Sequence, residues 1–231
     1  MYPNVQEQAA LNAAENLMKK TMARYDPSHD AFHVQRVRKT ALSIARSLSA
    51  KQPDLLVVEL AALLHDVLDK KYVSEAEAAD PYGYFVPFFQ SLSSEHGLDL
   101  IDDGRARQIV KVIENVSWTT EKKLRETGKT EEWHRTCVEL HCVQDADRLD
   151  AIGAFGIMRC AAYSAAVNRY VSHSMHLQVV STPPVQHFYD KLLHIQERLK
   201  TEPGKQMGAK RHQFMVDFLN SVQDEYDAEA P

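Results

Sequence analysis

The sequence predicts an all-α protein, and three observations carry that prediction. Apolar residues recur at helical spacing along nearly the whole chain, only 8 of the 231 residues are glycines, and no segment alternates apolar and polar residues as a half-buried strand would. With 44% hydrophobic residues, the chain can also bury one sizeable core. We therefore expect a single helical domain over residues 1–231, with a core at about 28–160 and C-terminal helices at about 183–224 completing its pocket.

Three helices are expected in the first third of the chain. An Ala-rich helix covers 5–24, and a second spans roughly 30–49. In the second helix the apolar residues advance by threes and fours, and this spacing places His33 on the inward face. A third helix begins after Pro53, and its periodicity turns His65 inward as well.

The middle of the chain is less regular in sequence. The aromatic, proline-containing stretch 80–90 interrupts the helical pattern, so we expect a lid or a pocket wall there. A helix capped by Asp102-Asp103 follows and ends near Trp118. The charged stretch 119–133 is expected to be an exposed connection.

The last third returns to clear helical periodicity. A helix from about Thr136 carries Asp147 and Asp150 along one face. The final two helices are expected at approximately 183–200 and 205–224, separated by a Thr-Glu-Pro-Gly segment.

Composition limits the partners and the compartment. A formal net charge of -5 and a pI near 6.1 give no reason to expect affinity for nucleic acid polymers or for an anionic membrane. The three cysteines form no metal-type CxxC motif and are expected to stay reduced. The N-terminal segment contains acidic residues and lacks an apolar signal region, and no run reaches membrane-spanning length. We expect a cytoplasmic protein.

Ionisable side chains stand where buried helices normally carry apolar ones. His33, the His65-Asp66 pair and Asp147 all fall on faces that are otherwise apolar. One such histidine is more often a hydrogen-bonded core residue than a ligand, and a helix-end aspartate can turn to solvent. Three separate helices that turn such groups inward instead favour a shared cation, because a buried carboxylate needs a positive partner. Two imidazoles and two carboxylates suit one divalent cation, with positions left for water and substrate, which indicates metal-assisted hydrolysis.

Four extended blocks of the sequence resemble one known family in order and spacing. They are HDAFHVQRV, VVELAALLHDVLDKKY, VQDADRLDAIGAFGI, and HFYDKLL together with AKRHQFMVDFL. They resemble the HD-domain metal-dependent phosphohydrolases, an all-helical superfamily, and within it a small bacterial and fungal branch that includes nucleotide pyrophosphohydrolases. The resemblance runs from about residue 28 to 220 and implies an HD-type helical bundle.

The resemblance implies one mononuclear metal site with four ligands, which are His33, His65, Asp66 and Asp147. Asp147 is chosen as the last ligand because it opens the D-[KR]-[LW] run that HD proteins carry, whereas Asp145 lies about 200° away around the helix. Asp150 is assigned to orienting a ligand histidine or a bound water, with an exposed capping role as the alternative. The ion would be divalent: manganese, magnesium, iron, cobalt, nickel or zinc.

The resemblance also implies residues around the metal. Asp69 would orient or deprotonate the attacking water, and His29 would contact phosphate or act as an acid. The alternatives are a salt bridge to Lys70 or Lys71 for Asp69, a helix cap for His29, and solvated surface for the lysines. Arg211 is a further possible anion contact, and packing and salt bridges between helices are the alternative for the C-terminal residues. The proposed substrate-binding residues are Arg36, Lys71, His187 and Lys191.

The expected substrate is a small phosphorylated molecule, and nucleotides fit best. The expected reaction converts a nucleoside triphosphate to the monophosphate and pyrophosphate. The alternatives are a nucleoside monophosphate phosphatase, a di-iron HD oxygenase and a non-catalytic nucleotide sensor. An oxygenase would need further histidine ligands, for which His96, His134 and His141 are available, but their polar surroundings favour a single ion. A homodimer is expected from the family alone.

Overall fold

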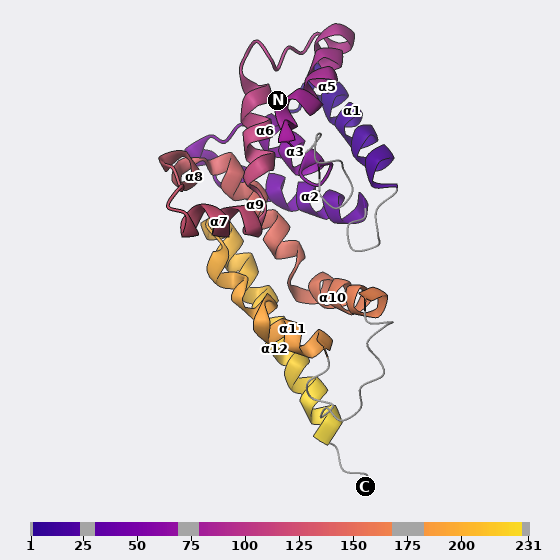
Figure 1. The fold of residues 1–231 in the computed structure, drawn as a ribbon, viewed down its shortest axis with the longest axis vertical. Coiled ribbons are helices and arrows are strands. Elements are labelled where there is room, and N and C mark those ends of the chain that lie inside the picture. Colours follow the sequence, from indigo (N-terminus) through magenta and orange to yellow (C-terminus); the bar gives the residue numbers. More distant parts are fainter. Residues whose placement is uncertain (1, 24–30, 69–78, 168–182, 228–231) are drawn as a thin grey trace. The chain divides into compact units, whose positions relative to one another are not determined.

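The computed structural model of the chain describes residues 2–23, 31–68, 79–167 and 183–227 and is built of helices (Figure 1). No strand occurs within these ranges, so the predicted all-α class is confirmed. None of the helices in these ranges combines the length and the apolarity needed to cross a membrane.

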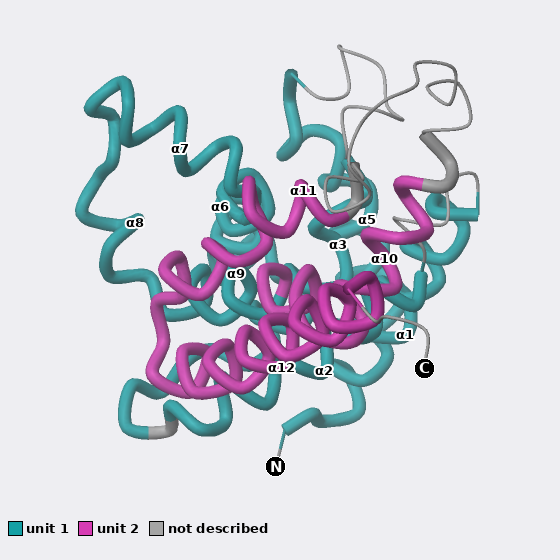
Figure 2. Tube along the Cα trace, turned by 90° about the horizontal axis from the view of Figure 1, so that it is seen from below, with its two compact units in different colours: residues 1–146 teal, residues 147–231 magenta. Residues whose placement is uncertain are grey.

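The chain divides into two compact units, Met1–Ala146 and Asp147–Pro231, which Figure 2 shows in different colours. Each unit is described by itself. Helix α9 (Val138–Asp150) contributes its first nine residues to the first unit and its last turn to the second.

The first unit is organised around one short apolar helix, α3. All residues of α3 after Leu55 are buried, and the helix packs against α1, α2 and α6. Helix α5 in turn packs against α1 and α6. The elements before α9 are α1 (Val5–Met22), α2 (Ala31–Ser47), the 3-10 helix η1 (Ser49–Lys51), α3 (Leu55–Leu64), α5 (Pro81–His96), α6 (Arg105–Asn115), α7 (Trp118–Glu126) and α8 (Glu132–Thr136).

A buried ion-pair network ties the first three helices together. Glu59 on α3 is only 4% exposed, and the Arg38 guanidinium on α2 lies 2.7 Å from its carboxylate. The same guanidinium reaches Glu15 on α1 at 2.9 Å. The Tyr2 hydroxyl donates to the second Glu59 oxygen. A buried carboxylate of this kind is tolerated because a cation and a hydroxyl both satisfy it.

The second unit contains α10 (Gly153–Val167), α11 (Pro183–Asp190), the 3-10 helices η4 (Leu192–His194) and η5 (Gln196–Arg198), and α12 (Glu202–Asp227). Helix α12 packs against α10 and η5. Its first turn is fixed by Thr201, whose hydroxyl accepts the N–H of Gly204 at 3.0 Å. The expected helix at 183–200 is therefore only α11 followed by two 3-10 turns, and the last helix begins three residues earlier than expected.

The expectation that 80–90 interrupts the helical pattern is wrong. This stretch forms most of α5, which begins with Pro81 and is capped by Asp80, whose carboxylate accepts the N–H of Gly83 at 2.9 Å. Proline is compatible with the first helical position because its fixed φ is helical and its missing N–H would have no partner there. The buried rings of Phe85 and Phe89 then belong to the core.

The neighbouring boundaries also differ from expectation. Helix α6 is preceded by Gly104, whose φ of +83° closes the preceding turn, and no side chain caps the helix. Asp103 instead accepts the backbone N–H of Arg105 at 2.9 Å and its Nε–H at 2.7 Å. The helix ends at Asn115. The charged stretch 119–133 is largely helical, because Ser117 caps α7, which continues to Glu126, and α8 begins at Glu132.

Candidate metal centre

Three ionisable residues meet where α2 packs against the end of α3. His33 lies in the first turn of α2, His65 is the C-cap of α3, and Asp66 follows it. The nitrogen Nε2 of His33 lies 3.5 Å from Oδ2 of Asp66, and Nε2 of His65 lies 3.4 Å from Oδ1. The two histidine side chains are 2% and 3% exposed, and that of Asp66 is 18% exposed. The group is thus buried on the imidazole side and reachable on the carboxylate side.

The spacing of these three donors fits a single ion. Each residue offers one ligand atom, and the three atoms all lie within 4.8 Å of one another. Bonds of about 2.1 Å place adjacent ligand atoms roughly 3 Å apart and opposite ones roughly 4.2 Å apart. The described residues contain no other group of this kind.

The orientation of His65 also suits a metal ligand. Its Nδ1 lies 2.8 Å from the carbonyl oxygen of Ala62, which is an acceptor only. The Nδ1 atom must therefore carry the proton, and the lone pair is left on Nε2, the atom that faces Asp66.

The end of α3 adds an electrostatic reason for a cation. The last carbonyls of a helix have no partners within it, and the helix dipole makes this end partly negative. His65 and Asp66 follow directly after the C-terminus of α3, Leu64. The helix end and the carboxylate therefore attract positive charge to the same place.

The fourth predicted ligand, Asp147, lies in the last turn of α9 and is half-buried. Its assignment as a ligand stays a prediction. Its neighbour Asp150 is 3% exposed, and Arg159 donates to its carboxylate at 2.9 Å. An exposed capping role for Asp150 is excluded by this burial.

The predicted residues around the metal fall into two groups. The described part of the chain includes Arg36, which is half-buried on α2 three residues after His33. Three others, the catalytic candidates Asp69 and His29 and the substrate-binding candidate Lys71, lie outside the described residues.

The two C-terminal substrate-binding candidates lie at the end of α11. His187 is half-buried, and Lys191 is exposed one turn later. Burial lowers the pKa of His187, the Lys191 charge lowers it further, and Asp190 partly opposes both. His187 is thus neutral at pH 7 and can donate one N–H to a bound group.

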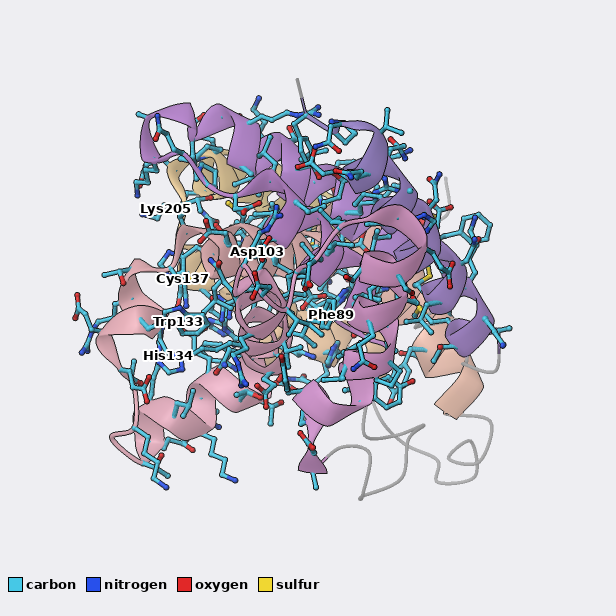
Figure 3. All side chains as sticks on the ribbon, turned by 90° about the horizontal axis from the view of Figure 1, so that it is seen from above. Phe89, Asp103, Trp133, His134, Cys137 and Lys205 are labelled. Atoms are coloured by element: carbon cyan, nitrogen blue, oxygen red, sulfur yellow. The ribbon has the colours of Figure 1, made fainter. Side chains whose placement is uncertain are left out.

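Two of the histidines that a second metal would require are already engaged. The Nδ1 of His134 accepts the N–H of Glu131 at 3.1 Å, so its Nε2 carries the proton that faces Asn115 at 3.2 Å. The Nε2 of His141 lies 2.9 Å from the carbonyl of His134. Figure 3 shows His134 beside Trp133 on α8. His134 and Asn115 line a pocket of about 620 Å³, which none of the three clustered residues lines.

Two contacts of the candidate residues, one in each unit, were not predicted from the sequence. The Ala62 carbonyl that orients His65 is a backbone group, so no residue type could signal it. Arg159, the partner of Asp150, lies nine residues away across the junction of two helices, where no helical spacing rule connects them.

The sequence is similar to a known protein family and to a bacterial protein. The sequence model of the HD domain matches residues 31–152 of the chain. The chain is also 30% identical over 195 residues to the YpgQ protein of Bacillus subtilis, an alignment that covers 84% of this chain and 83% of that protein.

Solved structures are similar over almost the whole length. The crystal structure of Bacillus subtilis YpgQ in complex with ADP gives a TM-score of 0.66 at 25% identity and covers 96% of this chain and 97% of that one. An HD-superfamily hydrolase from Bacillus thuringiensis gives 0.69 at 25% identity, with 96% and 100% coverage. The Lin1889 protein of Listeria innocua gives 0.67 at 29% identity, with 97% and 99% coverage.

Proposed function

The chain belongs to the HD domain family, and from this premise we propose that it is a divalent-metal-dependent phosphohydrolase that acts on nucleotides. The proposed reaction cleaves a nucleoside triphosphate between the α and β phosphates and releases the monophosphate and pyrophosphate. The observation that carries the proposal is the group of His33, His65 and Asp66, whose donor atoms lie within 4.8 Å of one another at the end of an apolar helix.

The substrate class is supported by two of the similar structures. Bacillus subtilis YpgQ forms a complex with ADP, and the Bacillus thuringiensis protein is an HD-superfamily hydrolase. ADP contains a base, a ribose and an α–β phosphoanhydride, and a nucleoside triphosphate shares all three. A site that recognises these groups suits the substrate that we propose.

The proposed site holds one divalent ion, chosen from manganese, magnesium, iron, cobalt, nickel and zinc, through His33, His65, Asp66 and Asp147. When bound, such an ion supplies Lewis acidity that makes water easier to ionise and offsets phosphoryl charge. The hydrogen bond from His65 Nδ1 to Ala62 keeps the ring in one orientation throughout. In this proposal Asp69 accepts a proton from the attacking water, and His29 contacts the phosphate or donates a proton.

Phosphate charge is met by residues supplied from several elements. Arg36 and Lys71 contribute cations close in sequence to the metal ligands, and Lys191 contributes one after α11. His187 contributes a neutral hydrogen-bond donor, because burial lowers its pKa. These cations are needed locally, since the chain carries a formal net charge of -5.

The test is a reaction panel with product identification. The purified chain is incubated with nucleoside mono-, di- and triphosphates and each divalent ion, and products are followed by phosphorus NMR. We expect pyrophosphate and a monophosphate from triphosphates. Asp66→Asn should reduce the rate to background, because it removes the ligand charge at nearly constant size. The matched control is Asp102→Asn, which changes an exposed aspartate that has no ion pair in the described part of the chain.

Other products would point to the alternatives. Inorganic phosphate released from monophosphates alone would favour the phosphatase. Oxygen uptake with two irons per chain would favour the oxygenase. A chain that binds metal and turns over no nucleotide would contradict the proposal and favour a nucleotide sensor.

A further inference from the structure

Two arginines fix the last turn of α9, the turn that carries Asp147. The Arg148 side chain is 5% exposed, and its Nη1 donates to the carbonyl of Arg198 at 2.7 Å. The Nη1 of Arg211 on α12 donates to the carbonyl of Leu149. Leu149 lies in the last turn of α9, and its carbonyl also accepts the backbone N–H of Ile152, just beyond the helix, at 3.3 Å. An arginine that donates to such a carbonyl also carries the charge that the helix end favours.

The backbone that follows α9 packs closely against the Arg211 side chain at Gly153. Gly153 adopts a φ of +75°, and a Cβ built there would lie 3.0 Å from Cγ and 3.1 Å from Cβ of Arg211. The backbone therefore passes directly over the stem of this arginine. Burial lowers the pKa of Arg211, and the Asp150 carboxylate opposes the shift.

Helix α12 is seated closely enough to hold Arg211 in place. Gly208 lies one turn before it, and a Cβ there would fall 2.2 Å from Cδ1 of Leu199 and 3.8 Å from Cδ2 of Leu149. Helix α12 thus lies against the end of α9 and against Leu199, which follows η5, and a side chain at 208 would force the Leu199 methyl group to shift. Met215, one turn after Arg211 and on the same face of α12, is fully buried.

We infer that Arg211 is a positioning residue for Asp147, because it holds the carbonyl two residues further along in the same helical turn. This inference rests on the proposed function, in which Asp147 is a metal ligand. A ligating carboxylate has to be held within about 0.5 Å of its productive position, and helix ends fray. The Leu149 carbonyl already accepts the Ile152 N–H, so the contribution specific to Arg211 is to tie this last turn of α9 to α12. Loss of Arg211 therefore weakens metal binding through Asp147 and leaves the other three ligands in place.

The experiment measures the Mn²⁺ dissociation constant of the full chain by titration calorimetry. We expect Arg211→Ala to weaken binding about 10–100-fold, the usual effect of removing a group that orients a ligand, and Arg211→Lys to recover part of the loss. Gly153→Ala should act in the same direction, because its methyl group displaces the Arg211 stem. If Arg211→Ala does not fold, as judged by circular dichroism, the other two variants carry the test.

A double-mutant cycle separates positioning from a general structural role. If Arg211 acts through Asp147, Arg211→Ala should cause no further loss of affinity in an Asp147→Ala background. The control is Leu219→Ala, which removes a buried side chain from the same helix and should lower the melting temperature without changing the Mn²⁺ affinity.

Three results would overturn the inference. They are wild-type affinity in Arg211→Ala, an equal loss with and without Asp147, and an equal loss in Leu219→Ala. A wild-type chain that binds no Mn²⁺ would instead overturn the proposed function, and the inference with it.

Discussion

His65 shows how a backbone group can prepare a side chain for metal binding. The Ala62 carbonyl can only accept, so it holds the proton on Nδ1 and leaves the lone pair on Nε2, which faces Asp66. The donor and the acceptor lie three residues apart at the end of one helix. The orientation of His65 therefore requires that the last turn of α3 is formed, because that turn places the Ala62 carbonyl beside the ring. Folding of the helix end thus also orients the candidate ligand.

The cysteine thiols are expected to be unreactive in the folded protein. Burial raises the pKa of Cys137 to about 11 and that of Cys142 to about 12, and it also raises that of Cys160. At pH 8 a thiol with a pKa of 11 is roughly one part in a thousand thiolate, the form that attacks a disulfide. Ellman's reagent should therefore react slowly with the native chain and with three thiols per chain in guanidinium.

The pH dependence gives a second measurement of the same effect. Because the folded pKa values lie above the usual 9.0, the native reaction rate should keep rising beyond pH 9. A thiol that reacts within seconds at pH 8 in the native chain would contradict the expectation. Single substitutions of Cys137, Cys142 and Cys160 by alanine would identify it.

The site could be predicted from the sequence as far as residue types allow. His33, His65 and Asp66 are conspicuous because they interrupt apolar helix faces, and the structure brings them together. Assigning Asp147 over its acidic neighbours rests on the motif and stays a prediction. The contacts of Arg148 and Arg211 with backbone carbonyls could not be predicted, because any residue supplies a carbonyl and only tertiary structure selects which one.

At the scale of elements, the stability of α5 depends on its N-cap, Asp80, which the sequence analysis did not identify. Asp80→Ala should lower the free energy of unfolding by about 1 kcal/mol, because it leaves the N–H of Gly83 without its acceptor. The control is Asp102→Ala, an exposed aspartate that the sequence predicted as a cap and that does not cap α6. Urea unfolding curves would measure both. Equal effects of the two substitutions would contradict the assignment of the cap.

The errors in predicting α5 and α7 have one physical origin. Proline and aromatic residues in 80–90 lower helix propensity, and the charged residues in 119–133 remove the apolar stripe on which periodicity depends. In both segments the residues that begin the helix favour helix formation despite this composition. They are Asp80 and Pro81 for α5 and Ser117 for α7. Capping signals of one or two residues are easily outweighed when a window of ten or more is judged by its composition.

The Arg38 network is expected to contribute strongly to the packing of α1, α2 and α3. Arg38→Ala leaves the Glu59 carboxylate buried without a cation, and breaking a buried pair in this way costs about 3 kcal/mol or more. Unfolding in urea would measure the loss. Arg46→Ala is the control, since it removes an exposed arginine from the same helix without an ion pair in the described residues, and should change stability by less than about 0.5 kcal/mol.

A second substitution distinguishes loss of the ion pair from loss of side-chain packing. In an Arg38→Met background, Glu59→Gln should recover part of the stability because no buried charge is left unpaired. The amide can still accept the Tyr2 hydroxyl bond. If Glu59→Gln is as harmful in that background as alone, the cost lies in packing and not in the unpaired charge.

At the scale of the whole molecule, the charge balance makes metal binding and substrate binding interdependent. A chain with a net charge of -5 repels a nucleotide at long range unless cations near the site offset that field. A divalent ion in the proposed site supplies two of those positive charges. Nucleotide affinity should accordingly increase when metal is present, and metal affinity should increase by the same factor when nucleotide is present.

The thermal stability of the folded chain should report directly on metal binding. Mn²⁺ at 100 times its dissociation constant stabilises the folded state by about 2.7 kcal/mol if the unfolded chain does not bind it. For a chain of this size each kcal/mol raises the melting temperature by about 2–4 °C, so the expected increase is roughly 5–10 °C, and EDTA should reverse it. Asp66→Asn should lose the increase and Asp102→Asn should keep it. A melting temperature that is the same in Mn²⁺ and in EDTA, or an increase that survives in Asp66→Asn, would show that the cluster of His33, His65 and Asp66 does not hold the ion.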